Sequence, residues 1–262
     1  MTPSSGFSFP VLLLYIRFKT KNTGSKMTEQ IIPAHLRSAT ALPVHGVVFD
    51  MDGLLLDSET LAMDALVDAG KDLGYDIPMS FCRSMIGVPA DGCRKLVHEA
   101  YGVAFPMEDF FARQEVLLRE YVDNGRLVLK TGVLPLLDLL DEFRIPRAIA
   151  TSSSRYRTDH HLELVGLDKR FDATVTRDDV SAGKPNPEPY LKAAEKIGVE
   201  PKYCLALEDS HSGARAAHAA GIRVIVVPDL LQPADDIHEK ALAIVDDLTV
   251  VRAYLKTILK AA

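Results

Sequence analysis

The sequence contains little cysteine, with three in 262 residues, and it has no Cys-x-x-Cys pair. An odd number of cysteines argues against a disulfide framework. We therefore interpret Cys82, Cys93 and Cys204 as reduced thiols, which pack like small apolar side chains. Reduced thiols are typical of a cytosol-like compartment, so the expected location is cytoplasmic.

A long basic run is also absent, and the formal net charge is −6 at pH 7. This charge balance argues against a nucleic-acid partner. The hydrophobic content of 47% and the charged content of 25% are ordinary for a soluble globular protein and exclude a disordered or collagen-like chain. If an acidic protein binds an anion, the site itself has to supply positive charge, from a lysine or a metal ion.

The sequence lacks a long hydrophobic segment as well. The apolar stretch 7–18 is interrupted by a proline and an arginine and is too short to span a bilayer. A secretory signal normally has a basic residue before its apolar stretch, and none precedes this one. We therefore expect no membrane partner. We treat residues 1–41 as a tail outside the core. The tail has basic residues and no acid before Glu29, so an organelle transit peptide and a true start at Met27 both stay open.

After the tail, short apolar runs alternate with helical patterns. The runs lack polar alternation, which is typical of strands buried on both faces. Gly166, Gly198 and Gly221 follow three of the helical patterns, where a helix is expected to end. The alternation predicts an α/β fold, a Rossmann-like parallel sheet with helices on both faces. The expected strands are 46–49, 148–150, 173–175, 204–207 and 222–227. The expected helices are 135–143, 155–165, 188–197 and 210–220.

One stretch, residues 58–126, breaks this alternation because it contains no convincing strand. It follows the first strand, so a helical insert here would stand over the strand end that carries Asp50. We interpret residues 58–126 as an all-helical cap domain and assign residues 42–57 and 127–262 to the catalytic core. The helical patterns of the cap lie at 60–73, 91–101 and 107–123.

The first motif with chemical content is Asp50-Met51-Asp52-Gly53, directly after the first strand. In an extended segment, residues two apart point to the same side, so both carboxylates can face one pocket. Such a pair suits phosphoryl transfer, with Asp50 as nucleophile and Asp52 as proton donor and acceptor. Gly53, assigned to substrate contact, lets the chain turn away without a side chain. An ordinary acidic turn after a strand is the alternative interpretation.

The second motif is Thr151-Ser152, directly after the strand 148–150. Hydroxyl and backbone N–H groups at a turn from strand to helix can hold phosphate oxygens. We therefore assign Thr151 to catalysis and Ser152 to substrate binding. A plain N-cap of the following helix explains the same residues.

The third motif is Lys184, in a loop that three prolines stiffen. A lysine at the site would neutralise the charge that carboxylate and phosphate share in the transition state. The alternative is a solvated turn lysine.

The fourth motif is Glu208-Asp209, after the strand 204–207. Paired acids at a strand end suit a hard divalent cation such as Mg²⁺, which binds oxygen ligands and keeps several waters. Helix capping by Asp209 is the alternative. Each motif has such an ordinary explanation, but the four together, in chain order near different strand ends, indicate a magnesium-dependent phosphohydrolase.

This set of motifs resembles that of the haloacid dehalogenase superfamily over about residues 44–248. The resemblance implies a Rossmann-like core, Mg²⁺, and metal ligation by Asp50, the backbone carbonyl of Asp52 and Asp209, with Glu208 assisting. The segments 183–190 and 207–217 are similar to the branch of β-phosphoglucomutase and phosphoglycolate phosphatase, which has a helical cap. The superfamily's four motifs correspond to Asp50 with Asp52, Thr151, Lys184, and Glu208 with Asp209.

Two departures from the related mutases bear on the reaction. Ala62 stands where the mutases carry a histidine, and segment 87–90 lacks the arginine that clamps a second phosphate. Both absences favour hydrolysis over mutase chemistry, while Asp52 argues against dehalogenase activity. A phosphosugar mutase stays open as one alternative. A non-catalytic sensor of a phosphorylated metabolite is the other.

The expected substrate is a small phosphorylated metabolite, with a sugar phosphate ahead of phosphoglycolate. Cap residues would select it, and Arg83 and Arg94 are the assigned substrate-binding candidates, beside Lys95 and His98. Among the histidines of the core, His211 ranks first because it follows the acidic pair. A monomer or a weak homodimer is expected.

Overall fold

The computed structural model describes residues 43–88 and 90–261, together with Leu36. The expected tail 1–41 therefore lies outside the described residues, apart from Leu36. That leucine is 1% exposed and joins the main hydrophobic cluster, so one residue of the expected tail packs against the core.

A sheet of six parallel strands forms the centre of the core, in the order β3-β2-β1-β4-β5-β6. The order places β1 and β4 side by side at the point where the connections change direction, which is where open α/β sheets bind ligands. The predicted parallel sheet is confirmed, and the unexpected β6 is only two residues long. The strands are β1 (Gly46–Phe49), β2 (Arg147–Ala150), β3 (Ala173–Val175), β4 (Cys204–Glu208), β5 (Arg223–Val226) and β6 (Ala243–Ile244).

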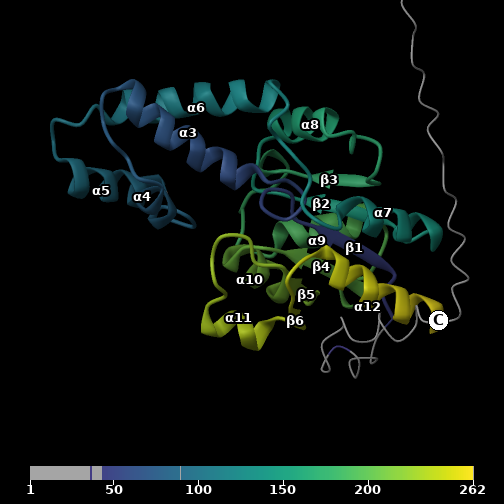
Figure 1. The fold of residues 1–262 in the computed structure, drawn as a ribbon. Coiled ribbons are helices and arrows are strands. Elements are labelled where there is room, and N and C mark those ends of the chain that lie inside the picture. Colours follow the sequence, from purple (N-terminus) through teal and green to yellow (C-terminus); the bar gives the residue numbers. More distant parts are fainter. Residues whose placement is uncertain (1–35, 37–42, 89, 262) are drawn as a thin grey trace, which may run out of the picture.

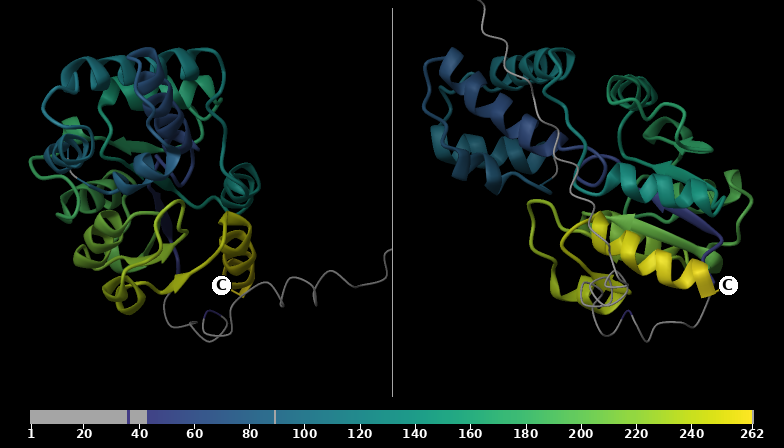
Figure 2. Two further views of the ribbon diagram at one scale, coloured as in Figure 1. Left: turned by 60° about the vertical axis from the view of Figure 1, so that its left-hand side comes forward. Right: turned by 45° about the vertical axis from the view of Figure 1, so that its right-hand side comes forward.

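Helices cover both faces of the sheet, as predicted (Figures 1 and 2). Successive strand residues point to opposite faces. Val47 and Phe49 therefore join a cluster with α7 (Val133–Glu142), α12 (Leu248–Ala261) and the apolar side of α8 (Arg155–Leu164). Val48 joins the opposite cluster. The helices on that opposite face are α9 (Glu188–Lys196), α10 (His211–Ala219) and α11 (Asp235–Lys240).

The helical stretch between β1 and α7 stands away from the sheet (Figure 1). It has its own hydrophobic cluster, which includes Phe105 and Phe110. Among the described residues, no helix combines the length and apolar character needed to cross a membrane. The helices of this stretch are α3 (Ser58–Asp72), α4 (Met79–Ser84), α5 (Ala90–Tyr101) and α6 (Met107–Asp123).

Two connections join this helical stretch to the core, and they run side by side. The backbone N–H of Asp57 donates to the carbonyl of Val128, and that of Lys130 donates to Leu55. The Lys130 ammonium also contacts Asp229, in the loop after β5, at 2.5 Å. The helical stretch is thereby held next to the carboxyl ends of the strands.

Candidate active site

Three acidic residues meet where β1 and β4 end. Asp50 directly follows β1, Glu208 is the last residue of β4, and Asp209 follows it. Because β1 and β4 are paired in parallel, their carboxyl ends lie at the same edge of the sheet. One ligand oxygen of each carboxylate lies within 4.8 Å of the others. The adjacency of two strands distant in sequence creates this cluster.

Lys184 neutralises two of these carboxylates. Its ammonium lies 2.5 Å from Asp50 Oδ1 and 2.5 Å from Glu208 Oε1, and its side chain is only 3% exposed. Burial alone would lower the pKa of Lys184, but the two carboxylates outweigh burial and raise it. The lysine therefore stays charged. Tyr190 completes this arrangement, because its hydroxyl donates to Glu208 Oε1 at 2.6 Å.

Asp50 and Asp209 are buried acids whose charged forms the protein alone does not fully stabilise. Burial raises the pKa of Asp50, and the Lys184 ammonium counteracts that rise. Burial also raises the pKa of Asp209, and the carboxylates of Asp50 and Glu208 raise it further. Asp209 Oδ1 is buried without a hydrogen-bond partner among the described residues. Hard oxygen ligands with an unpartnered carboxylate oxygen fit a divalent cation, which would lower both pKa values.

Two glycines make room for these carboxylates. Gly53 has φ +84°, and a Cβ there would lie 2.3 Å from Asp209 Oδ2. A Cβ at Gly213, in α10, would lie 1.7 Å from Glu208 Oε1. Both positions therefore require glycine because an acidic side chain occupies the space of a Cβ. The structure places the predicted Gly53 against a carboxylate of the acidic cluster.

Asp52 lies beside the cluster and is held by three donors. Ser58 donates to its Oδ1 at 2.7 Å, and Ser153 donates to its Oδ2 at 2.7 Å. Arg157 contacts Oδ1 at 3.2 Å. Burial alone would raise the pKa of Asp52, but Arg157, Ser153 and Ser58 together lower it. The carboxylate is therefore ionised in this arrangement.

The segment after β2 supplies hydroxyl groups at the same edge of the sheet. Thr151 is buried, its N–H donates to Val175, and its Oγ1 accepts from the N–H of Ser153. Ser152 is exposed. Ser154 caps α8 through its side chain. The ordinary N-cap is therefore present, at Ser154, while phosphate binding by Thr151 and Ser152 stays a prediction.

Two hollows open beside the site. The Asp209 hollow has a volume of about 290 Å³ and lies under the helical stretch, with Glu59, Gly87, Asp209 and Leu231 in its wall. Burial, Asp229 and Asp52 raise the pKa of Glu59 to about 7. The Arg157 hollow, of about 460 Å³, lies between α6 and the start of α8. Its lining includes Arg119, Ser152, Ser153, Arg157, His161 and Arg177.

Comparison with known proteins identifies the family of this chain. The model of the haloacid dehalogenase-like hydrolase family matches residues 47–227. The chain belongs to this family. The phosphorylated carbohydrates phosphatase of Thermotoga maritima is 34% identical over 182 residues, 70% of this chain and 84% of that protein. Hexitol phosphatase B of Escherichia coli is 34% identical over 196 residues, 72% of this chain and 86% of that protein.

A solved structure agrees at the level of the fold. A haloacid dehalogenase family hydrolase of Deinococcus radiodurans, with bound phosphate and sodium, has a TM-score of 0.72 and 25% identity. The match covers 82% of this chain and 96% of that one. The predictions of family and fold class are confirmed. The prediction of an enzyme that hydrolyses phosphoric monoesters is confirmed at the level of this family and of its relatives named as phosphatases.

In this haloacid dehalogenase-like hydrolase, the two arginines predicted to bind substrate have no described contact with the acidic cluster. Arg83 is exposed, and Arg94 pairs with Glu108 inside the helical stretch. Neither arginine lines the two hollows described above. His211 Nε2 contacts the carbonyl of Gln232 at 2.9 Å, which ties it to the loop after β5. Of the segment 87–90, Pro89 lies outside the described residues.

Several residues of the site carried no usable sequence signal. Ser153 lies in the predicted serine run, but only the fold brings its hydroxyl to Asp52. Ser58, Arg157 and Glu59 come from helices whose approach to the sheet the sequence pattern does not specify. From the sequence pattern, Tyr190 is indistinguishable from an ordinary apolar residue of α9. These residues can be identified only from their contacts.

Proposed function

We propose that this protein is a magnesium-dependent phosphatase of a small phosphorylated metabolite, with a sugar phosphate as the expected substrate. The observation that carries the proposal is the buried cluster in which Lys184 contacts both Asp50 and Glu208 while Asp209 keeps an unpartnered oxygen. This arrangement combines a nucleophile, a fixed positive charge and free cation ligands. The relatives named for phosphorylated carbohydrates and hexitols support the substrate class.

The first half of the proposed reaction transfers the phosphoryl group to the enzyme. A carboxylate oxygen of Asp50 attacks phosphorus, and the bond between phosphorus and the leaving oxygen breaks. Asp52, which is ionised in the arrangement described above, first takes up a proton from solvent and then gives it to that leaving oxygen, so the alcohol departs neutral. Lys184, Thr151 and the N–H groups of the turn after β2 offset the negative charge on the phosphoryl oxygens.

The second half releases inorganic phosphate. The carboxylate of Asp52 takes a proton from a water molecule, which attacks phosphorus. The bond between phosphorus and Asp50 breaks, and both carboxyl groups return to their starting states once Asp52 gives its proton back to solvent. Asp50, Asp209 and the Asp52 carbonyl, with Glu208 assisting, would hold Mg²⁺, which when bound offsets the repulsion between carboxylate and phosphate.

We further propose that residues 58–126 form the cap that covers this site. Their helices share a hydrophobic cluster of their own, and the Asp209 hollow lies between them and the core. Ala62, where related mutases carry a histidine, favours hydrolysis over mutase chemistry. A sensor role has no support because no proposed catalytic position is replaced. Substrate choice would then depend on the residues that the cap presents to the two hollows.

The test is phosphate release from a generic aryl phosphate with purified protein. We expect turnover that requires Mg²⁺, is lost with a chelator and returns when Mg²⁺ is added. Asp50→Asn should reduce kcat by at least about a thousandfold, because the amide is a poor nucleophile. The exposed Asp109 offers the matched control, Asp109→Asn, with unchanged kcat. Undiminished turnover by Asp50→Asn would exclude the proposed mechanism.

A further inference from the structure

Glu208 lies fully buried in the acidic cluster, and protein donors occupy both of its carboxylate oxygens. Its Oε1 accepts from the Lys184 ammonium at 2.5 Å and from the Tyr190 hydroxyl at 2.6 Å. Its Oε2 accepts from the backbone N–H of Ser210 at 3.2 Å and from the Ser210 hydroxyl at 3.0 Å. A carboxylate offers about four lone-pair sites, so these donors leave Glu208 no spare site for a cation.

Glu208 differs in this respect from its neighbour Asp209. Asp209 Oδ1 is buried without a hydrogen-bond partner among the described residues, so it can still bind a cation. The backbone of Gly213 packs against Glu208, because a Cβ there would lie 2.0 Å from the carboxyl carbon. The Glu208 carboxylate therefore cannot shift towards α10. The structure thus gives the two acids different tasks, with Asp209 free to bind a cation and Glu208 holding Lys184.

Tyr190 contacts both members of the pair formed by Glu208 and Lys184. Its hydroxyl donates to Glu208, and the Lys184 ammonium lies 5.2 Å from the centre of its ring. Tyr190 is fully buried. Burial and the charge of Glu208 raise the pKa of Tyr190 well above its usual value, so the hydroxyl keeps its proton and acts as a donor.

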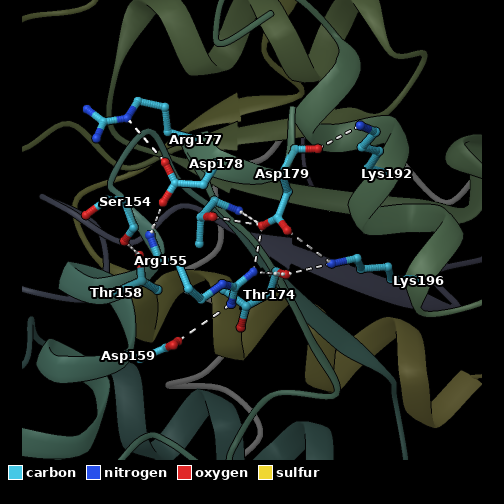
Figure 3. Close-up of polar contacts among 11 residues, drawn as sticks. Ser154, Arg155, Thr158, Asp159, Thr174, Arg177, Asp178, Asp179, Lys192 and Lys196 are labelled. Carbon is cyan, nitrogen blue, oxygen red and sulfur yellow. Dashed lines mark hydrogen bonds and ion pairs between the residues drawn. The ribbon is translucent and has the colours of Figure 1, made fainter. Parts of the chain in front are cut away.

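The helix that carries Tyr190, α9, is attached to the edge of the sheet. The Lys192 ammonium donates to the carbonyl of Asp179 at 2.7 Å, and the Lys196 ammonium donates to the carbonyl of Thr174 at 3.0 Å (Figure 3). Thr174 lies in β3, and Asp179 lies in the turn that follows this strand. Because Tyr190 is on the same short helix, these contacts fix the position from which its hydroxyl donates.

We propose that Tyr190 is a positioning residue of the active site, whose hydroxyl binds Glu208 so that Lys184 is shared between Glu208 and Asp50. This inference rests on the proposed phosphatase function, in which Lys184 offsets the charge of the phosphoryl group. A hydrogen bond to Glu208 Oε1 reduces the attraction of that oxygen for the ammonium. Without the hydroxyl, Glu208 would draw Lys184 away from Asp50 and from a phosphoryl group bound beside it.

Tyr190→Phe tests the inference, because it removes the hydroxyl and keeps the ring. We expect kcat for an aryl phosphate to fall about tenfold. The Mg²⁺ concentration for half-maximal activity should stay within about twofold of the wild-type value, since Glu208 has no oxygen to spare for the cation. Phosphate release is measured over a range of Mg²⁺ and substrate concentrations. A wild-type kcat, or a loss that more Mg²⁺ restores, would overturn the inference.

Tyr254→Phe is the matched control. Tyr254 is 1% exposed, and its hydroxyl has no hydrogen-bond partner among the described residues. It belongs to α12, on the other face of the sheet from α9. The substitution therefore removes the same atom from an equally buried ring without breaking a bond, and kcat should not change. An equal loss of kcat in both variants would contradict a specific role of the bond to Glu208. Thermal unfolding sets an assay temperature at which each variant is folded.

Binding of inorganic phosphate separates this inference from the proposed function. Calorimetry in the presence of Mg²⁺ gives the Kd of phosphate for the wild type and for both variants. We expect Tyr190→Phe to raise this Kd by about threefold or more, and Tyr254→Phe to leave it unchanged. If the wild type releases no phosphate from any ester, the proposed function fails and this comparison alone decides the inference. Equal Kd values for the wild type and Tyr190→Phe would then overturn it.

Discussion

At the scale of single residues, Gly53 and Gly213 show how tightly the acidic cluster is built. Each gives a carboxylate the space that a Cβ would occupy, beside Asp209 and Glu208 respectively. Because the backbone at these glycines packs directly against the carboxylates, the carboxylates can bind a cation without first changing position. The metal affinity of the site should therefore depend on residues that offer no ligand atom.

Gly53→Ala tests this dependence. The new methyl group would lie 2.3 Å from Asp209 Oδ2, so the carboxylate must move. We expect the Mg²⁺ concentration for half-maximal activity to rise by roughly 10- to 100-fold. Gly74→Ala is the matched control, because Gly74 has a similar φ of +80° and a Cβ there would have no described atom within 4 Å. Equal Mg²⁺ responses in the two variants would show that backbone strain alone is responsible.

The sequence indicated the charged residues of the site because each is recognisable from its residue type and from its position next to an apolar run. Asp50, Asp52 and Glu208 each lie at or next to the end of an apolar run, and strand ends share one edge of a parallel sheet. The hydroxyl and guanidinium partners of Asp52 were not predictable in this way. Ser58 and Arg157 are 6 and 105 residues away from it, and helix packing alone brings them together.

At the scale of elements, the loop before α9 fixes Lys184. Glu188, in the first turn of α9, accepts hydrogen bonds from the N–H groups of Ser181 and Ala182 and pairs with Lys192. These interactions lower the pKa of Glu188 from 4.5 to about 2. The carboxylate therefore holds the start of the loop against the helix that follows it.

Glu188→Gln should weaken this attachment. Because the folded state lowers the pKa of Glu188, its contribution to stability is present above pH 4.5 and is lost as the pH falls towards 2. We expect a lower Tm than wild type at pH 7, a difference that shrinks below pH 4.5, and a reduced kcat. The exposed Glu195, on the same helix, provides the control Glu195→Gln. A pH-independent difference between Glu188→Gln and wild type would contradict this role.

At the scale of the whole molecule, the helical stretch has a hydrophobic cluster of its own, and only its inner ends, at Leu61 and Val122, join the main cluster of the core. Phe110 is fully buried in the cluster of the helical stretch, where its ring contacts Phe105 edge-on at 5.2 Å between centroids. The paired connections around Asp57 and Lys130 are the covalent link between the two parts. Such an arrangement predicts that the helical stretch can open without unfolding the sheet.

Phe110→Ala tests this independence. The cavity should cost about 3–5 kcal/mol within the helical stretch. Hydrogen exchange should accelerate in α3 to α6 while the strands β1, β2 and β4 keep their protection. Val103→Ala, at a position that is 87% exposed, should change stability by less than about 0.5 kcal/mol. Equal acceleration in the sheet would mean that the two parts unfold as one unit.

The sequence by itself determined the parallel sheet, the helical stretch after the first strand and the charged groups at the strand ends. These features depend on local periodicity and on residue types that only certain chemistry requires. The tertiary structure decided which of those groups meet. It brought Lys184 between Asp50 and Glu208, set Arg157 against Asp52, and left Arg94 paired with Glu108. Contacts between residues far apart in the chain follow from strand order and helix packing, which no local pattern records.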